Sequence, residues 1–541
     1  MGIYLNPGSK KFEMAVNSAI YVDKTGMISY LNSLINTEQR YLAVSRPRRF
    51  GKTMAAEMIC AYYSRCGNTR PLFESRCIAD SDHWDQYLNS FNVIRINMLD
   101  FVIRSKNSGD LIRLLQQKVA AELTAAYGDV AYDDPGDLAF VMENIYSQTG
   151  DQFVIVIDEW DCIFREFRQD SEGQKRYLDF LRDLMKDRAY VALAYITGIL
   201  PVKKYGQHSA LNMFVEYSML DPGQLAEYAG FTDTEVRTLC AVHGRDYDKI
   251  REWYDGYELY GIIPPGQAEP LEYQIYSPYS VVQAILSGQI RDYWNATETY
   301  EALSVHINRN FSGLRDMILL LMEYKRIPVN TRKYQNDMDS LASADDVLTL
   351  LIHLGYLAYD SRDSEVYIPN QEVLDEYRNT VSEDQNWTRL YAVLDQSQRL
   401  LEATWAGDEE TVSGLLDKAH MKAGNLTYNS EAALSYAIRL AYFNAEQYYT
   451  LIPEMQAGKG YADLVYIPSP ACPDKPAMVI ELKYDQDADT AISQIHRRQY
   501  PSSLDQYSGN LLLVGISYQR DARSGSISWK QHKCRIEKYR K

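Results

Sequence analysis

The segment Ser45-Arg-Pro-Arg-Arg-Phe-Gly-Lys-Thr53 decides the fold of the first part of this chain. It follows the short apolar run Tyr41–Val44 and opens the helix that we predict at Met54–Ser64. In a strand–loop–helix unit of this kind, backbone N–H groups and the helix N-terminus bind phosphate. The segment therefore predicts a P-loop in which Lys52 reaches the β- and γ-phosphates and the Thr53 hydroxyl binds Mg²⁺.

The loop departs from the usual P-loop pattern at two positions. Arg46 stands where G-x-x-x-x-G-K-[ST] has its first glycine, and Pro47 lacks an N–H group that could bind phosphate. By this motif alone, a basic turn before an ordinary helix is the alternative interpretation. The loop residues that we assign to nucleotide binding are Arg46, Arg48, Arg49, Phe50, Gly51, Lys52 and Thr53.

A second element, Val154-Ile-Val-Ile-Asp158-Glu159, is an apolar run that ends in two acids. Two acids at the end of a buried strand are costly unless they meet a cation, so we interpret the run as a Walker B strand and not as a solvated strand end. In this interpretation Asp158 holds Mg²⁺ and Glu159 polarises the attacking water. The two elements occur in the expected order, each at a strand end, which favours ATP as the ligand.

Apolar runs of strand length predict a parallel sheet in the first part of the chain. Asn92–Asn97, Phe153–Ile157 and Val191–Ile196 are separated by segments long enough for crossover helices. We therefore expect an α/β fold, a P-loop sheet with helices on both faces. Thr197 ends the last run, and we assign it to the γ-phosphate as a sensor residue; a strand-terminal threonine in a turn is an equal alternative.

From about residue 216 the pattern becomes mainly helical, with helices predicted at Leu225–His243, Tyr279–Gly288 and Phe311–Lys325. A helix at Asp345–Leu354 and two strand-like runs around the turn Ser361–Ser364 resemble a winged helix. We favour a structural helix and hairpin over a DNA-reading wing. A third part, with strands and helices, contains a helix predicted at 430–444. We divide the chain into residues 1–215, 216–390 and 391–541.

In the third part, acids and a lysine lie on two neighbouring strands. Asp463 belongs to one strand-like run, and Glu481-Leu-Lys483 belongs to the next. Because side chains alternate along a strand, Glu481 and Lys483 project from one face, where Asp463 can meet them. Two carboxylates and the backbone carbonyl of Leu482 would bind Mg²⁺ or Mn²⁺, and Lys483 would position the attacking water.

The charges of Glu481 and Lys483 interrupt an apolar run, which favours a functional site over a surface ion pair. Gln494, on the following helix, is added to the catalytic set. Glu431 is a candidate extra acid and Tyr500 a candidate accessory residue. An ordinary structural role is the alternative for each of these three.

Composition limits the class of protein. The 541 residues carry a net charge of −17, which argues against a surface that is basic throughout, although a local basic groove is compatible with it. The seven cysteines show no zinc spacing, and neither a signal peptide nor an apolar run of about 18 residues is present, so we expect a cytoplasmic protein without a membrane span. Basic residues near the C-terminus could offset the net charge or form an ordinary solvated end: Arg520, Arg523, Lys530, Lys533, Arg535, Lys538, Arg540 and Lys541.

These motifs resemble those of bacterial AAA-ATPase-like proteins fused to a C-terminal PD-(D/E)XK nuclease-superfamily domain. The resemblance covers nearly the whole chain, although Trp160 stands where relatives have Tyr and Ala462 stands where the superfamily's name has Pro. The segments that carry it are Ile20-Tyr-Val-Asp-Lys-Thr25, Ser45–Thr53, Val156-Ile-Asp-Glu-Trp-Asp161, Ile196-Thr-Gly-Ile199, Trp253-Tyr-Asp-Gly-Tyr257, Leu354-Gly-Tyr-Leu357, Gly458-Lys-Gly-Tyr-Ala-Asp463, Val479-Ile-Glu-Leu-Lys483 and Ala491-Ile-Ser-Gln494.

The resemblance implies ATP binding and a nuclease-like fold. Two functions follow as hypotheses. The first is an ATP-controlled nuclease that acts on DNA, with RNA as an open alternative, in defence or mobile-element biology. The second is a nucleotide-switched module that binds nucleic acid or protein without cleaving it. The intact Asp463, Glu481 and Lys483 favour the first, and the net charge of −17 favours the second. A homo-oligomer is compatible with both.

Overall fold

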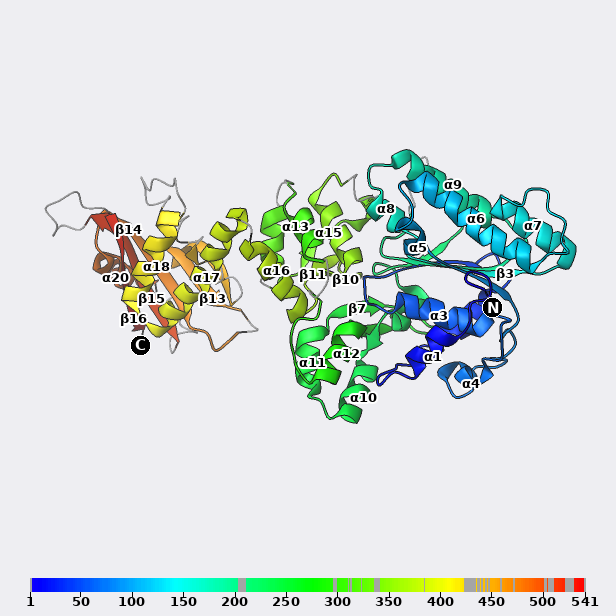
Figure 1. Ribbon diagram of the computed structural model, residues 1–541. Helices are drawn as coiled ribbons and strands as arrows, with labels where there is room; N and C mark the ends of the chain where they lie inside the picture. Colours follow the sequence, from blue (N-terminus) through cyan, green and yellow to red (C-terminus); the bar gives the residue numbers. More distant parts are fainter. Residues whose placement is uncertain are drawn as a thin grey trace. The chain divides into compact units, whose positions relative to one another are not determined.

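The chain forms two compact units, Met1–Arg378 and Asn379–Lys541 (Figure 1). The three-part division at residues 215 and 390 stays a prediction. The computed structural model describes residues 2–202, 211–294, 299–309, 311, 314–322, 324–334, 341–383, 385–422, 434, 438, 441–442, 445, 448–457, 460–469, 472–500, 504, 510–520 and 530–539.

The first unit contains a five-stranded sheet in the order β2-β3-β4-β1-β5, with every described pair parallel. The predicted parallel sheet is therefore confirmed. Because β4 lies between β1 and β3, the carboxyl ends of these three strands are neighbours at one edge. The strands are β1 Tyr41–Ser45, β2 Asn92–Asn97, β3 Phe153–Asp158, β4 Val191–Gly198 and β5 Val215–Tyr217.

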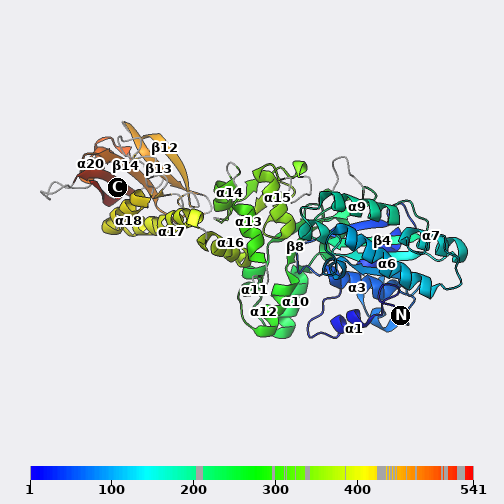
Figure 2. The same ribbon diagram turned by 45° about the horizontal axis from the view of Figure 1, so that its top comes forward.

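Helices cover both faces of this sheet, as Figures 1 and 2 show. One face carries α1 Lys10–Val16, α2 Met27–Leu34, α3 Lys52–Tyr63 and α4 Arg70–Phe73, followed by a 3₁₀ turn at Cys77–Asp80. The other face carries α5 Met98–Val102, α6 Ser108–Ala126, α7 Leu138–Thr149, α8 Cys162–Glu166 and α9 Ser171–Met185.

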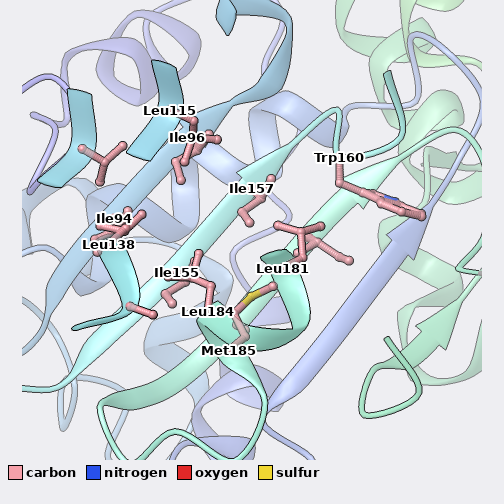
Figure 3. Packing of buried hydrophobic residues seen from close by; sticks show 14 of the residues in the cluster. Ile94, Ile96, Leu115, Leu138, Ile155, Ile157, Trp160, Leu181, Leu184 and Met185 are labelled. Atoms are coloured by element: carbon pink, nitrogen blue, oxygen red, sulfur yellow. The ribbon is translucent and has the colours of Figure 1, made fainter. Parts of the chain in front are cut away.

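Alternation along β3 explains why the sheet needs two helical layers. Ile155 and Ile157 pack in the core under α6, α7 and α9, and Figure 3 shows them beside Leu181 and Leu184 of α9. Val154, one residue away, packs in the core on the α3 side. An uninterrupted apolar strand is therefore buried on both faces.

The rest of the first unit is mainly helical, with two small three-stranded sheets, β6-β8-β7 and β10-β11-β9. Its elements are a 3₁₀ turn at Gly223–Tyr228, β6 Phe231–Thr232, α10 Asp233–His243, α11 Tyr247–Tyr254, β7 Tyr257–Tyr260, β8 Glu272–Tyr276, α12 Pro278–Ser287, α13 Thr299–Ile307, α14 Leu314–Met322, β9 Ile327–Pro328, a 3₁₀ turn at Thr331–Lys333, α15 Ala344–Leu354, β10 Ala358–Asp360, β11 Glu365–Tyr367 and α16 Gln371–Glu383.

Two sequence predictions for this part have different outcomes. The helix and hairpin of the winged-helix pattern are present as α15 and the antiparallel pair β10–β11. The single helix predicted at Leu225–His243 is wrong. Gly230 separates a 3₁₀ turn from α10, and Thr232 caps α10 in a capping box with Glu235. A side chain at position 230 would collide with Ile275 and the carbonyl oxygen of Tyr276, so the chain passes close to β8 here.

The second unit contains the mixed sheet β12-β13-β14-β15-β16, in which only β14 and β15 are parallel among the described pairs. Helices α17 and α18 pack on one face, and α20, between β14 and β15, packs on the other. The elements are α17 Gln385–Ala406, α18 Glu409–Lys422, β12 Tyr449–Ala457, β13 Gly460–Pro468, β14 Ala477–Tyr484, α20 Ala488–Arg497, β15 Leu511–Arg520 and β16 Lys530–Tyr539.

The α/β expectation for the third part is thus confirmed. Most of the helix predicted at 430–444, including Glu431, lies outside the described residues. Within the described part of the chain, no helix has both the length and the apolar composition that crossing a bilayer requires.

A buried acid, Glu372 of α16, holds the segment before α13 in place. Its Oε1 accepts hydrogen bonds from the backbone N–H groups of Tyr293 (2.7 Å) and Trp294 (3.0 Å), and the side chain is almost fully buried. Burial raises the pKa of Glu372 from 4.5 to about 7, and the two backbone hydrogen bonds only partly oppose this rise.

Replacing Glu372 with Gln should remove one pH-dependent term from the stability of the first unit. Since the folded-state pKa is raised, the contribution of this carboxyl is complete below its unfolded pKa and is lost as pH rises through about 7. The thermal midpoint of the parent should therefore fall relative to Glu372→Gln between about pH 5 and pH 7.5 in calorimetry. The exposed Glu252→Gln, on α11, is the control, and parallel profiles for parent and Glu372→Gln would contradict the assignment.

Candidate functional site

The phosphate loop joins β1 to α3 through two residues with left-handed backbone. Gly51, which precedes α3, has φ of 80° and Arg49 has φ of 69°. A Cβ at Gly51 would meet no neighbouring atom, so only its backbone angle requires glycine there. This turn brings the N-terminus of α3 to the carboxyl edge of the sheet, as the sequence predicted.

Lys52 lies under the loop that it follows. Its Nζ donates to the carbonyl oxygens of Arg46 (3.0 Å) and Pro47 (2.8 Å). Burial lowers the pKa of Lys52, while Glu159, Asp161 and Asp158 oppose that effect. The charge of Lys52 is thus favoured by three acids from the end of β3 and the turn after it.

A cavity of about 590 Å³ opens over this loop. This volume lies in the range of sites that hold small ligands and cofactors. The residues that line it are Arg48, Arg49, Gly51, Lys52, Thr53, Met54, Leu99, Glu159, Arg165, Glu166, Pro278, Tyr279 and Val282.

Two predicted loop residues direct their side chains away from this cavity. Arg46 is buried, with Nη1 donating to the Ser45 carbonyl (3.2 Å) and Nη2 to the Leu225 carbonyl (3.4 Å). Phe50 packs edge-on against Tyr257 and Trp294. Any contribution of Arg46 or Phe50 to phosphate binding would therefore come from backbone atoms.

Asp158, at the end of β3, is fully buried, and neither of its carboxylate oxygens has a hydrogen bond of ordinary geometry to a described residue. Burial raises the pKa of Asp158, and the nearby Thr53 hydroxyl opposes the rise. Arg95 Nη2 lies 3.8 Å from Asp158 Oδ2, beyond hydrogen-bond distance, and it pairs more closely with Glu57 at 2.6 Å. A buried acid without hydrogen bonds is costly, and a divalent metal ion held by Asp158 and Thr53 would offset its charge. Thr197 pairs in register with Asp158, and its buried hydroxyl also lacks a hydrogen-bond partner among the described residues.

Glu159 has left-handed backbone, with φ of 55°, and its carboxylate accepts a hydrogen bond from Arg165 of α8. Arg165 Nε also lies 3.5 Å from Asp161 Oδ2, which accepts the backbone N–H groups of Ile199 (3.2 Å) and Leu200 (2.9 Å). Sequence reasoning assigned no role to Asp161 or Arg165. The motif around Asp158 contains Asp161, but no spacing pattern marks Arg165.

A second, apolar pocket of about 220 Å³ adjoins the cavity and shares Gly51, Met54, Pro278 and Val282 with it. The other residues that line it are Phe12, Ala15, Ser18, Ile20, Tyr21, Val22, Lys24, Met27, Phe50, Ala55, Met58, Tyr228, Gly230 and Phe231.

The acids and lysine of the second unit meet on the α20 side of its sheet. Glu481 is buried, and its Oε1 accepts from Lys483 Nζ (3.2 Å) and from the Gln494 amide of α20. Lys483 Nζ also donates to the Leu482 carbonyl (2.9 Å). The structure therefore brings Glu481, Lys483 and Gln494 together, and Leu482 points its side chain to the opposite core.

Asp463 joins this group from β13. Its Oδ2 accepts the backbone N–H of Leu482 at 2.7 Å, just beyond the described β13–β14 pairs, which end at Leu464 and Ile480. The Tyr500 hydroxyl lies 3.5 Å from Gln494 Nε2. Burial raises the pKa of this hydroxyl, and the negative charges of Glu481 and Asp463 add to the rise.

The donor set suits a hard cation. Carboxylate and carbonyl oxygens are the ligands that Mg²⁺ and Mn²⁺ prefer. Among the described residues, no group of three or more His, Cys, Asp and Glu side chains is arranged to hold a metal ion, so a site here would rest on Asp463, Glu481 and the carbonyl of Leu482. The role of Leu482 as a ligand stays a prediction, because its carbonyl bonds to Lys483 in this structure.

Two family models match the chain. Residues 8–207 match the model described as "Predicted AAA-ATPase", and residues 434–526 match that of the PD-(D/E)XK nuclease superfamily. The chain joins an AAA-ATPase-like segment to a PD-(D/E)XK superfamily segment. The resemblance stated from the sequence is confirmed. Residues 8–207 contain the phosphate loop and Asp158, although Pro278, Tyr279 and Val282 of the cavity lie outside this segment, and residues 434–526 contain Asp463, Glu481 and Lys483.

Other comparisons give more distant similarity. A protein of Azotobacter chroococcum mcd 1 described as "Uncharacterized protein in vnfD 5'region" is 27% identical over 290 residues, 52% of this chain and 51% of that protein. The chain thus spans about half the length of this curated relative. The Aeropyrum pernix ORC1 protein in complex with DNA superimposes with a TM-score of 0.26 and 11% identity, over 72% of this chain and 100% of that chain. CDC6P of Pyrobaculum aerophilum superimposes with a TM-score of 0.24 and 10% identity, over 68% of this chain and 97% of that chain. TM-scores this low support no statement about this chain.

Gly515 of β15 sets how closely α20 approaches the sheet. It pairs in register with Glu481, and a Cβ at this position would lie 2.5 Å from the Ala488 carbonyl oxygen and 3.1 Å from the side chains of Ala491 and Ile492. Glycine therefore lets α20 carry Gln494 to Glu481.

Gly515→Ala should push α20 away from the sheet and destabilise the second unit by about 1–3 kcal/mol, as overpacking of a core does. Hydrogen exchange over Ala488–Arg497, measured by mass spectrometry, should become faster. Gly414→Ala is the matched control, because a Cβ there meets nothing within 4 Å and should stabilise α18 by about 0.5–1 kcal/mol. Unchanged hydrogen-exchange protection of α20 in Gly515→Ala would show that Gly515 does not set the distance between α20 and β15.

Proposed function

We propose that this protein binds and hydrolyses ATP in its first unit and that its second unit is a metal-dependent nuclease that cleaves DNA in the cytoplasm. One observation carries the ATP proposal: the buried Asp158 carboxylate, which has no hydrogen bond of ordinary geometry to a described residue, lies near Thr53, and Thr53 lines the cavity together with Lys52. The seven cysteines are free thiols, in line with a reducing compartment. A role in defence or mobile-element biology stays a prediction from the sequence.

The two adjoining pockets suit the two ends of a nucleotide. The larger cavity has Lys52, Thr53 and the N-terminus of α3 for the phosphates. The smaller pocket is mostly apolar and suits a base, which is flat and has apolar faces. The shared walls at Gly51, Met54, Pro278 and Val282 would lie beside the middle of the ligand.

Thr53 and Asp158 would hold the Mg²⁺ that accompanies ATP, and this ion would offset phosphate charge. Glu159 lines the cavity and would orient the attacking water. The water oxygen bonds to the γ-phosphorus while the bond from that phosphorus to the β–γ bridging oxygen breaks. ADP and inorganic phosphate leave, and the water proton passes by way of Glu159 to the phosphate.

Lys52→Ala should weaken Mg-ATP binding by roughly 10–100-fold, since it removes a charged hydrogen-bond donor. Isothermal titration calorimetry with Mg-ATP measures the effect, and circular dichroism checks that the variant is folded. Lys175→Ala, exposed on α9, is the control. Equal affinity of Lys52→Ala and the parent would refute the site.

The proposed nuclease site works through its own side chains as follows. Asp463 and Glu481 would hold Mg²⁺ or Mn²⁺, which polarises the scissile phosphate. Lys483, held between Glu481 and the Leu482 carbonyl, would orient the water or offset charge on the phosphate, and Gln494 would fix the Glu481 carboxylate. On β16, Lys533, Arg535 and Lys538 are exposed and could contact phosphates, whereas Arg523, Arg540 and Lys541 lie outside the described residues.

Asp463→Ala and Lys483→Ala should both abolish cleavage and change DNA affinity by less than about threefold, because phosphate contacts elsewhere supply most of that affinity. Asp463→Ala should lose Mn²⁺ binding, whereas Lys483→Ala should keep it. Cleavage of single- and double-stranded DNA and RNA, with and without ATP, provides the readout, and Lys418→Ala, exposed on α18, is the control. Cleavage that persists in both variants would refute this site.

The second hypothesis is a nucleotide-switched binding module. The net charge of −17 favours it, and so does the occupation of Asp463 Oδ2 by the Leu482 N–H. If the parent binds nucleic acid or a protein but cuts no substrate under any nucleotide and metal condition, this hypothesis replaces the nuclease.

A further inference from the structure

Arg165 of α8 lies at the wall of the phosphate cavity, one short turn after the strand that ends at Asp158. It lines the cavity together with Lys52, Thr53 and Glu159, and its side chain is 9% exposed. The charge of Arg165 lowers the pKa of Lys52, which lines the same cavity. Two cations on one cavity wall repel each other, and a bound phosphate would add to the attraction that Glu159 already provides there.

The acids around Arg165 keep it charged and in place. Glu159 accepts a hydrogen bond from Nη2, and Asp161 Oδ2 lies 3.5 Å from Nε. Burial lowers the pKa of Arg165, but Asp161 and Glu159 outweigh this effect and raise it. Glu166 lines the same cavity and adds a weaker attraction. The Arg165 guanidinium therefore lines the cavity in its charged form.

The hydrogen bonding of the guanidinium is incomplete in this state. Its Nε has no hydrogen-bond partner among the described residues, although the group has five N–H donors in a fixed fork. That fork matches a phosphate group better than a single carboxylate, because phosphate offers more charge and more oxygens. A terminal phosphate next to Lys52 would therefore compete with Glu159 for Arg165.

We propose that Arg165 binds the terminal phosphate of ATP from within the same chain and that this exchange releases Glu159 from its ion pair. The inference rests on the proposed ATP site and adds to it the residue that distinguishes ATP from ADP. Asp161 is a positioning residue, because it ties Arg165 to the backbone of Ile199 and Leu200 after β4. The carboxylate of Glu159 is then free to face water instead of Arg165.

The test compares the affinities of ATP and ADP, since only ATP carries the terminal phosphate. In Arg165→Ala and in Arg165→Gln, which keeps N–H donors without the charge, the preference for ATP over ADP should fall by roughly 10–100-fold. Affinity for ADP should change by less than about threefold. Arg182→Ala, on α9, removes an exposed arginine whose Nη2 lies 2.9 Å from Asp179 Oδ1, and it should keep the parental ratio.

Turnover provides the second readout. Millimolar guanidinium should partly restore ATP hydrolysis in Arg165→Ala, which a purely structural role would not allow. Turnover per molecule of the parent should not depend on protein concentration, because the arginine comes from the same chain. A rate that rises with concentration would assign the phosphate contact to a second copy and overturn the proposal.

The outcomes separate this inference from the function on which it rests. If the parent binds neither nucleotide, the ATP site itself is wrong. If the parent prefers ATP and both Arg165 variants keep that preference, the ATP site stands and the role of Arg165 is wrong. If Arg165→Ala does not fold, the ratio of ATP to ADP affinity in Arg165→Gln, compared with that of the parent, decides whether Arg165 binds the terminal phosphate.

Discussion

Pairing of buried charges at the carboxyl edge of the parallel sheet is the constraint on which the first unit depends. A buried ion is costly unless an opposite charge or a metal ion meets it. Arg95 of β2 lies 2.6 Å from Glu57 of α3 and 3.8 Å from Asp158, and Arg165 lies between Glu159 and Asp161. These pairs leave both carboxylate oxygens of Asp158 without a hydrogen bond to a described residue. A bound metal ion would offset the charge of Asp158, and phosphates would pair with the cations of the site.

The phosphate loop is held by the later part of the same unit. Arg49 donates to the carbonyls of Tyr293 (2.6 Å) and Trp294 (3.2 Å), and Pro47 lies against Gly355 so closely that a Cβ there would be 2.8 Å from Pro47. A loop rich in glycine would be mobile without such contacts. Here bulky side chains replace the glycines and anchor the loop. The helix–hairpin that contains Gly355 therefore helps to hold the loop, and the choice of a structural hairpin over a DNA-reading wing stays a prediction from the sequence.

In the second unit, close packing of a helix against the sheet positions part of the polar site. Gly515 allows α20 to lie against β15, and α20 then carries Gln494 to the Glu481 carboxylate. Lys483 donates hydrogen bonds to Glu481 and to the Leu482 carbonyl. Displacement of α20 would therefore remove the Gln494 contact from Glu481, whereas Asp463 and Lys483 are held by contacts with β14.

The sequence by itself determined the central strands, the start of α3 and the face on which Glu481 and Lys483 lie, but not the division of the segment 225–243 into a 3₁₀ turn and a helix. Apolar runs marked the central strands, the Gly-Lys-Thr turn marked the start of α3, and the alternation of a strand placed Glu481 and Lys483 on one face, because these properties depend on local geometry. Only the tertiary structure decided that the Arg46 side chain turns away from the cavity, that Arg165 pairs with Glu159, and that Asp463 accepts the Leu482 N–H. Those contacts join residues through the packing of separate strands, helices and turns, and no spacing along the chain encodes that packing.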